Sequence, residues 1–281
     1  MKKLLVFLLA MMMVCTAACA ENSAVIEIHE GEKLTLDLDG DGAVEDIYYQ
    51  MIGVEYEETL QLVIDGSDGE INVFGTDILY LYHAEIVDMD GDGTQEIILS
   101  GDVGSDDYYT WCLNYDVETG IEMMLFPDAE RGENTDSYFT RGYGVVMNIE
   151  GCDITLRGSQ DVLGTWMCSR TFTLKDGQFE LEDGGMWIMD DLAADETVWE
   201  YYYLNPITEL PVRFEDGSEG ILYPGEKFVP TKTDKLTVVS FLTQDGRRGT
   251  INLEENTEEG WGHKINGVAD WEYFEYMPYA D

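Results

Sequence analysis

Apolar and polar residues alternate along most of the chain after residue 20, as in β-strands that bury one face. Runs such as KLTLDL (33–38), TLQLVI (59–64) and DITL (153–156) recur every 8–15 residues. Asp-Gly and Gly-rich turns such as KDGQ (175–178) separate them, whereas helix is indicated only by one turn near residues 190–196. Short strands at this spacing predict an all-β fold built as a sheet repeat, a sandwich or a barrel.

The chain divides into two regions near residue 205. Acidic residues outnumber basic residues far more strongly in residues 21–204 than in residues 205–281. The stretch LNPITELPVR (204–213) between them holds two prolines, which suit a linker. We therefore predict an acidic β domain over residues 21–204 and a small β-barrel domain over residues 205–281.

An acidic loop occurs twice in the first region. LDLDGDGAVEDIYY (36–49) and VDMDGDGTQEIILS (87–100) carry acids and glycines at the same positions. The first acids of the two loops are 51 residues apart, a length that suits one four-stranded propeller blade. Two further steps reach Phe139, where the acids are missing, and Asp190, where the glycines are missing. The repeat is therefore clear in two copies and weak beyond them.

Both loops carry side chains that suit a hard cation. Counted from the first acid, acids occupy positions 1, 3, 5 and 9, and glycines occupy positions 4 and 6. Carboxylates in a tight turn supply the oxygen ligands that Ca²⁺ takes, and glycines adopt backbone conformations closed to other residues. The candidate ligands are Asp37, Asp39, Asp41 and Glu45 in the first loop and Asp88, Asp90, Asp92 and Glu96 in the second. The alternative is a pair of ordinary acidic hairpin turns, because Asp and Gly are favoured there too.

These loops differ from EF-hands, because position 12 is Tyr48 or Leu99 instead of glutamate, and strands follow instead of helices. They resemble the calcium loops of FG-GAP and VCBS repeats, which lie between strands of integrin-alpha-like β-propellers. The resemblance covers residues 34–101 and implies one Ca²⁺ ion in each loop, bound by its four acids. It also implies a small or incomplete propeller-like domain that acts as a binding or adhesion module. Both loops have glutamate where the family usually has aspartate at position 9, and in the first loop Asp46 can stand in for Glu45.

The second region resembles a different module. The stretch TVVSFLTQDGRRGTI (237–251) is similar to the closing hairpin of bacterial Src-homology-3-like domains, and Asp-Gly hairpin signals occur twice within residues 211–253. This resemblance implies a small barrel that serves as a cell-wall or peptide-binding accessory. Thr250 occupies a place where those domains often carry an aromatic residue.

The formal net charge of −43 limits the partners of the chain. Such a charge repels nucleic acid and anionic membrane surfaces and attracts cations. No stretch after the N-terminus approaches eighteen apolar residues, so we predict no transmembrane span. The expected partner is an extracellular protein or glycan.

The first twenty residues have the layout of a secretory signal peptide. Lys2 and Lys3 precede an apolar run over residues 4–14, and small residues follow it. Cleavage after Ala20 is one outcome. The other is cleavage before Cys19, which would leave this cysteine as a lipid anchor. Either outcome predicts export, as a secreted or cell-envelope protein.

Three cysteines lie beyond this segment: Cys112, Cys152 and Cys168. Cys152 and Cys168 form the closest pair for a disulfide in an exported chain. The alternative is three small buried thiols.

Catalytic signals are sparse. His29, His83 and His263 are scattered without metal-ligand spacing, and no nucleophile, phosphate or dinucleotide motif occurs. We therefore predict no catalytic residue and no cofactor besides calcium, with an extracellular carboxylate-dependent hydrolase as the alternative class. The aromatic sets, Tyr109 with Trp111 and Trp199 with Tyr201 and Tyr203, alternate as on strand faces and offer either a sugar-stacking platform or sheet core.

Overall fold

The computed structural model describes residues 24–54, 57–104, 107–127, 142–181, 185–189, 198–257 and 262–279. The predicted signal peptide, with Cys19, and the helical turn near residues 190–196 lie outside these ranges. Within them strand is the commonest structure, and helical structure is confined to short pieces such as the helix α1 (Val198–Tyr201) and the 3-10 turn η3 (Asp270–Glu272). The predicted all-β class is therefore confirmed. No helix of the described part is long and apolar enough to cross a membrane.

The first sheet is a four-stranded antiparallel meander. Its strands, in spatial order, are β2 (Leu34–Leu36), β3 (Glu45–Val54), β4 (Glu57–Asp65) and β5 (Ile71–Asp77). Strands that are neighbours in this sheet are also consecutive in the chain. Ile47 on β3 and Ile64 on β4 are register partners, and both are fully buried on the face turned to the second sheet.

The second sheet packs against the first. Its strands run in the order β1 (Ile26–Glu27), β6 (Tyr80–Val87), β7 (Glu96–Asp102), β8 (Tyr108–Asp116) and β10 (Gly142–Tyr143), with β9 (Gly120–Met124) also paired to β8. Every residue of β7 is buried. Ile97 packs into the core shared with the first sheet, whereas Ile98 packs on the opposite face against a third layer.

The third layer belongs to a ten-stranded sheet that continues to the far end of the molecule. Its first strands are β11 (Val145–Glu150), β12 (Asp153–Asp161), β13 (Thr165–Lys175), β14 (Gln178–Leu181) and β15 (Trp187–Met189). The remaining strands are β16 (Leu210–Phe214), β17 (Glu219–Leu222), β18 (Phe228–Thr233), β19 (Val238–Thr243) and β20 (Arg248–Asn252). A separate three-stranded sheet is formed by β21 (Glu254–Glu255), β22 (His263–Ile265) and β23 (Val268–Ala269).

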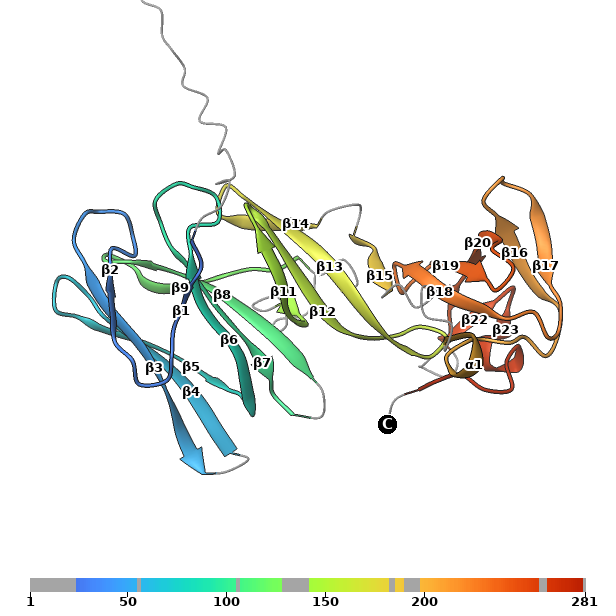
Figure 1. Ribbon diagram of the computed structural model, residues 1–281, viewed down its shortest axis with the longest axis horizontal. Coiled ribbons are helices and arrows are strands. Elements are labelled where there is room, and N and C mark those ends of the chain that lie inside the picture. Colours follow the sequence, from blue (N-terminus) through green and yellow to red (C-terminus); the bar gives the residue numbers. More distant parts are fainter. Residues whose placement is uncertain are drawn as a thin grey trace, which may run out of the picture.

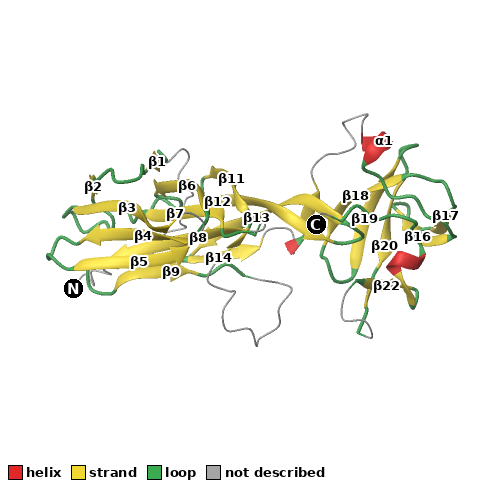
Figure 2. Cartoon of the chain, turned by 90° about the horizontal axis from the view of Figure 1, so that it is seen from below, coloured by secondary structure: helices red, strands yellow, loops and turns green. Residues whose placement is uncertain are grey.

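The two groups of strands at either end of the molecule are joined through β13 and β15 (Figures 1 and 2). Strand β15 pairs with β13 on one side and with β18 on the other, so hydrogen-bonded sheet crosses residue 205. One apolar cluster likewise holds Trp166 together with Phe228 and Phe241. The domain boundary near residue 205 stays a prediction. One sheet and one apolar cluster contain residues from both sides of this position.

None of the sheets closes into a barrel within the described residues. The propeller-like arrangement and the Src-homology-3-like barrel therefore remain predictions. Of the aromatic sets, Trp111 is buried in the core between the first two sheets, with Tyr109 packed against it. Strand alternation was wrong for Trp199 and Tyr201, which belong to the short helix α1.

Candidate metal centre

The two acidic loops lie at the same end of the first two sheets. Residues 37–44 connect β2 to β3, residues 88–95 connect β6 to β7, and both loops lie in the upper part of Figure 1. The Gln95 amide donates a hydrogen bond of 2.8 Å to the Leu38 carbonyl, so the backbones of the two loops are in direct contact. The turn between β8 and β9 joins them, because the Val117 amide donates to Asp39 Oδ2 at 3.1 Å.

The loops share one hydrogen-bond pattern, which the sequence repeat did not require. The carboxylate at position 9 accepts from the amide at position 2: Leu38 N to Glu45 Oε2 is 3.0 Å, and Met89 N to Glu96 Oε2 is 2.7 Å. The acid at position 1 accepts from the glycine amide at position 6, at 3.0 Å and 3.2 Å. The acid at position 3 accepts from position 5, and that at position 5 from position 7. The two loops therefore have matching backbones, although their carboxylates do not gather in the same way.

The glycines permit this backbone. At position 4, Gly40 and Gly91 have φ of 74° and 75°, and at position 6, Gly42 and Gly93 have φ of 89° and 96°. Other residues adopt such angles at a cost of about 1–2 kcal/mol. Gly40 has a second role, because a Cβ atom there would lie 3.1 Å from the Gly93 carbonyl oxygen. The loops therefore meet glycine to glycine.

Each loop gathers three of its four predicted ligands. Carboxylate oxygens of Asp37, Asp39 and Glu45 lie within 4.8 Å of one another, and those of Asp88, Asp90 and Asp92 do the same. Asp41 and Glu96 stand outside these groups. Glu96 is nevertheless only 3% exposed and is held by the Met89 amide. The two loops thus gather different members of the same predicted set.

Buried oxygens of the first loop have no partner. Glu45 is fully buried, and its Oε1 atom has no hydrogen bond among the described residues; the same is true of Asp37 Oδ1. An unpaired buried carboxylate is costly, because it loses its hydration without compensation. The arrangement fits a cation that would take the place of the missing partners.

The second loop shows the same deficit through its pKa values. Burial raises the pKa of Glu96 to about 8, opposed by the Met89 amide and reinforced by the charges of the neighbouring aspartates. Burial also raises the pKa of Asp90, and the charge of Asp92 adds to it. Both shifts mean that ionisation of these carboxyl groups is unfavourable here without a positive counterpart.

Tyr115 is a neighbour of the first loop that the sequence did not identify. It lies at the end of β8, is 1% exposed, and its hydroxyl has no hydrogen-bond partner among the described residues. Burial raises the pKa of Tyr115, and Glu45 is the largest charge acting in the same direction. Only sheet packing brings β8 beneath a loop that lies some seventy residues earlier in the chain, so no local signal could have found it.

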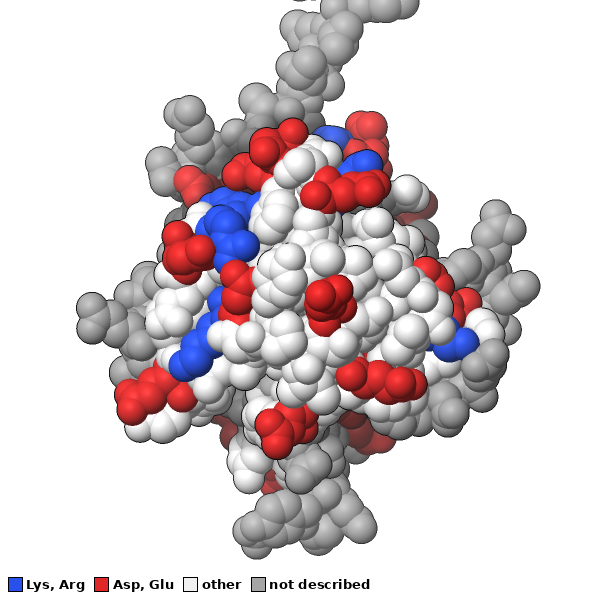
Figure 3. Space-filling model, turned by 90° about the vertical axis from the view of Figure 1, so that its right-hand side faces the viewer, with Lys and Arg blue, Asp and Glu red and all other residues white. Residues whose placement is uncertain are grey.

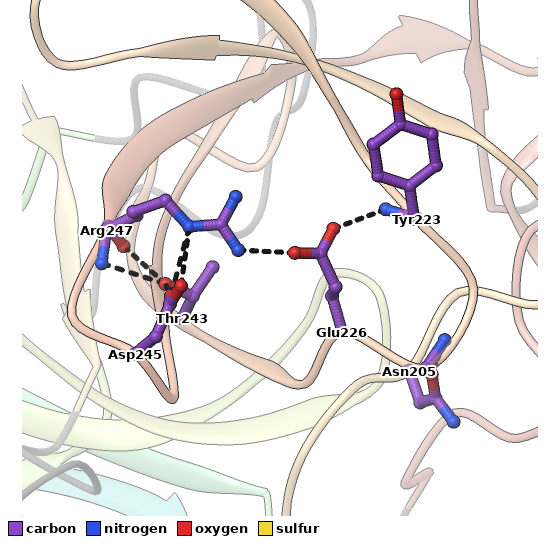
Figure 4. Close-up of polar contacts among 7 residues, drawn as sticks. Asn205, Tyr223, Glu226, Thr243, Asp245 and Arg247 are labelled. Carbon is purple, nitrogen blue, oxygen red and sulfur yellow. Dashed lines mark hydrogen bonds and ion pairs between the residues drawn. The ribbon is translucent and has the colours of Figure 1, made fainter.

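Acidic turns in the second region are built differently. Asp234 Oδ1 accepts hydrogen bonds from the amides of Leu236, Thr237 and Val238, at 2.8–3.0 Å. Asp245 accepts from Thr243 Oγ1 and from the Arg247 guanidinium, which also contacts Glu226 Oε1 at 2.5 Å (Figure 4). At this end of the molecule Lys and Arg lie beside acidic side chains, around a largely uncharged face (Figure 3). These acids are already paired.

The donors of the two loops suit calcium. The gathered ligands are all oxygens, with no histidine or cysteine among them. Ca²⁺ takes six to eight oxygens, and backbone carbonyls and water can complete the set, whereas Mg²⁺ gives up its water reluctantly. Each ion would neutralise the charge of its own loop and hold the ligands of that loop together.

The predicted disulfide and the family resemblance can also be compared with what was found. Cys112 and Cys168 are buried thiols outside any disulfide, so the predicted Cys152–Cys168 pairing is wrong. Cys152 is disulfide-bonded, so the alternative of three buried thiols is wrong as well. No protein-family model, curated protein or solved structure matches the chain. The resemblance to FG-GAP and VCBS repeats therefore depends on the two loops alone.

Proposed function

We propose that this chain is an exported β-sheet protein whose two acidic loops bind Ca²⁺ and which acts as an extracellular or cell-envelope binding module. The observation that carries the proposal is the fully buried Glu45, whose Oε1 lacks a partner beside Asp37 and Asp39. The ligands of the first ion are Asp37, Asp39, Asp41 and Glu45, and those of the second are Asp88, Asp90, Asp92 and Glu96. These loops are the part of the chain that is similar to FG-GAP and VCBS repeats.

The role of calcium in this proposal is structural. Each loop holds four carboxylates in one turn, and their mutual repulsion opposes folding until a divalent cation neutralises it. Ligands that are gathered only in the folded loops make ion binding part of the folding free energy. Extracellular calcium modules have dissociation constants of roughly 10⁻⁴–10⁻³ M, so sites of an exported protein would be largely filled outside the cell.

The proposed ligand is a protein or a glycan. The net charge of −43 opposes nucleic acid and anionic membranes and leaves neutral sugars and cationic peptides as favoured chemistry. Export is proposed from residues 1–20, with a lipid anchor at Cys19 as the alternative to cleavage after Ala20. Intact-mass analysis of the processed chain distinguishes the two.

The binding function is tested with a glycan and peptide array probed with the full chain, in millimolar calcium and in chelator. We expect calcium-dependent retention, which an Asp41→Ala/Asp92→Ala variant loses. A parallel screen follows hydrolysis of the retained ligands. Turnover without retention would replace the binding module by the extracellular carboxylate-dependent hydrolase, and retention that ignores chelator would remove calcium from the function.

A further inference from the structure

Strands β1 and β6 form a short antiparallel ladder at the edge of the second sheet. Glu27 lies opposite Glu85 in its register. The Ile28 amide donates to the Ala84 carbonyl at 2.7 Å, so the ladder continues one residue beyond β1. Ile28 and Ala84 are buried in the core between the first two sheets. Because side chains alternate along a strand, the residues flanking them lie on the opposite face.

Glu27 faces Glu85 in this register. His29 follows the Ile28–Ala84 hydrogen bond by one residue, so the same register, continued by one step, puts it across from His83. The hydrogen bond to Glu85 raises the pKa of His83, and the charges of Glu85 and Glu27 act in the same direction, against the effect of burial. The side chains of Glu27, His83 and Glu85 therefore lie on the same face of the sheet.

His83 is oriented by a hydrogen bond to a carboxylate, and His29 has a carboxylate nearby that is beyond hydrogen-bond distance. His83 Nδ1 lies 3.0 Å from Glu85 Oε1, and His29 Nδ1 lies 3.6 Å from Glu27 Oε1. Neither Nε2 atom has a hydrogen-bond partner among the described residues. A carboxylate behind one ring nitrogen, with the other nitrogen free, is the arrangement that prepares histidine for a metal ion.

We propose that His29 and His83 bind a divalent transition-metal ion, Zn²⁺ in particular, through their Nε2 atoms, with Glu27 and Glu85 as positioning residues. Directly opposed side chains have Cβ atoms about 4.5–5.5 Å apart, within reach of one ion at Zn–N distances of about 2.0–2.1 Å. The side chains of His29 and His83 are 63% and 34% exposed, so rotation of the rings closes the site. Water fills the remaining positions.

The proposed zinc site differs from the acidic loops in its ligand atoms and in the part of the fold that an ion there would stabilise. Imidazole nitrogen suits zinc and copper, whereas calcium takes oxygen ligands. Strand β1 is only two residues long, and an ion held by both strands would fasten it to β6. Zinc would therefore stabilise the N-terminal edge of the second sheet.

The test is calorimetric titration of the full chain with zinc chloride, in saturating calcium so that the acidic loops are occupied. We expect one zinc ion per chain. His29→Gln and His83→Gln should each weaken zinc binding by more than about tenfold. Glu85→Gln should weaken it by about tenfold, which is typical when a metal-binding histidine loses the carboxylate that orients its ring. His29→Gln should melt like wild type in zinc-free buffer, because this side chain is 63% exposed, whereas His83→Gln and Glu85→Gln also lose the hydrogen bond that joins these two partly buried side chains.

The matched control is the Asp41→Ala/Asp92→Ala variant, which alters the acidic loops and leaves the histidines. It should keep its zinc affinity while losing calcium. The inference is overturned if wild type binds no zinc, if the histidine variants bind it as tightly as wild type, or if zinc binding disappears in the loop variant instead. None of these results depends on whether calcium binds.

Discussion

Turns with acidic residues occur at both ends of the molecule, and they differ in what surrounds their oxygens. Asp234 in the second region is surrounded by backbone amides and the Thr237 hydroxyl, and the hydrogen bonds from these groups outweigh the effect of burial and lower its pKa. In the first region Glu45 is fully buried with an unpartnered oxygen, and burial raises the pKa of Glu96. Acids whose oxygens are satisfied by donors thus need no ion, whereas the buried oxygens of the two loops lack donors, and it is there that we propose a cation.

The largest effect expected from this difference is the response to calcium. Calcium at about ten times its dissociation constant adds about 1.4 kcal/mol for each filled site. Two sites should then raise the melting temperature by roughly 6–12 °C for a chain of this size. Differential scanning calorimetry in chelator and in millimolar calcium measures the shift. Identical curves would mean that calcium does not stabilise the two loops, which would then be ordinary acidic turns like those of the second region.

The effect of Glu45→Gln on stability should have opposite signs in chelator and in calcium. In chelator the substitution removes an unpaired buried charge and keeps an oxygen for the Leu38 amide, so the variant should equal or exceed wild type in stability. In calcium it removes a ligand and should lose about half of the calcium-induced shift. Melting curves in both buffers decide this, and a change of the same sign and size in both would contradict it.

The two loops should differ in their dependence on position 5. Asp92 belongs to the gathered group of its loop, whereas Asp41 stands outside the group formed by Asp37, Asp39 and Glu45. Asp92→Ala should therefore weaken its site by at least about tenfold, or 1.4 kcal/mol, and Asp41→Ala should weaken the other site less. Calcium titrations of the two variants measure this, and equal losses would show that the loops are equivalent.

Asp234→Ala provides the control from the second region. Its carboxylate serves three backbone amides and the Thr237 hydroxyl, so its loss should cost about 1 kcal/mol. The cost should be the same in calcium and in chelator, because no ion is involved. Urea unfolding under both conditions tests it, and a calcium-dependent cost would place a cation at this turn too.

The smallest effect separates the two glycines of the first loop. Gly40→Ala and Gly42→Ala both place a side chain at positive φ, at about 1–2 kcal/mol each. Only at Gly40 does the new Cβ also meet the Gly93 carbonyl, whereas nothing lies within 4 Å of it at Gly42. Gly40→Ala should therefore be the more destabilising, by roughly 0.5–1 kcal/mol. Equal unfolding free energies would mean that the loop contact carries no energy.

Local patterns predicted the strands, the turns and the acids of both loops, because alternation, glycine and aspartate act within a few residues. They could not predict that Glu45 is buried without a partner, since this depends on how two sheets pack. The neighbourhood of Tyr115 and the pairing of Glu27 with Glu85 also depend on strand register over long separations. The path of the ten-stranded sheet across residue 205 was missed for the same reason, because charge and proline content say nothing about pairing.

The central claim is that the two loops are cation sites, and equilibrium calcium binding to the full chain tests it most directly. Isothermal titration of chelator-treated protein should give two calcium ions per chain, and one ion for Glu45→Gln or for Asp92→Ala at the calcium concentrations that saturate wild type. Absence of calcium binding to wild type, or binding that both substitutions leave unchanged, would contradict the account.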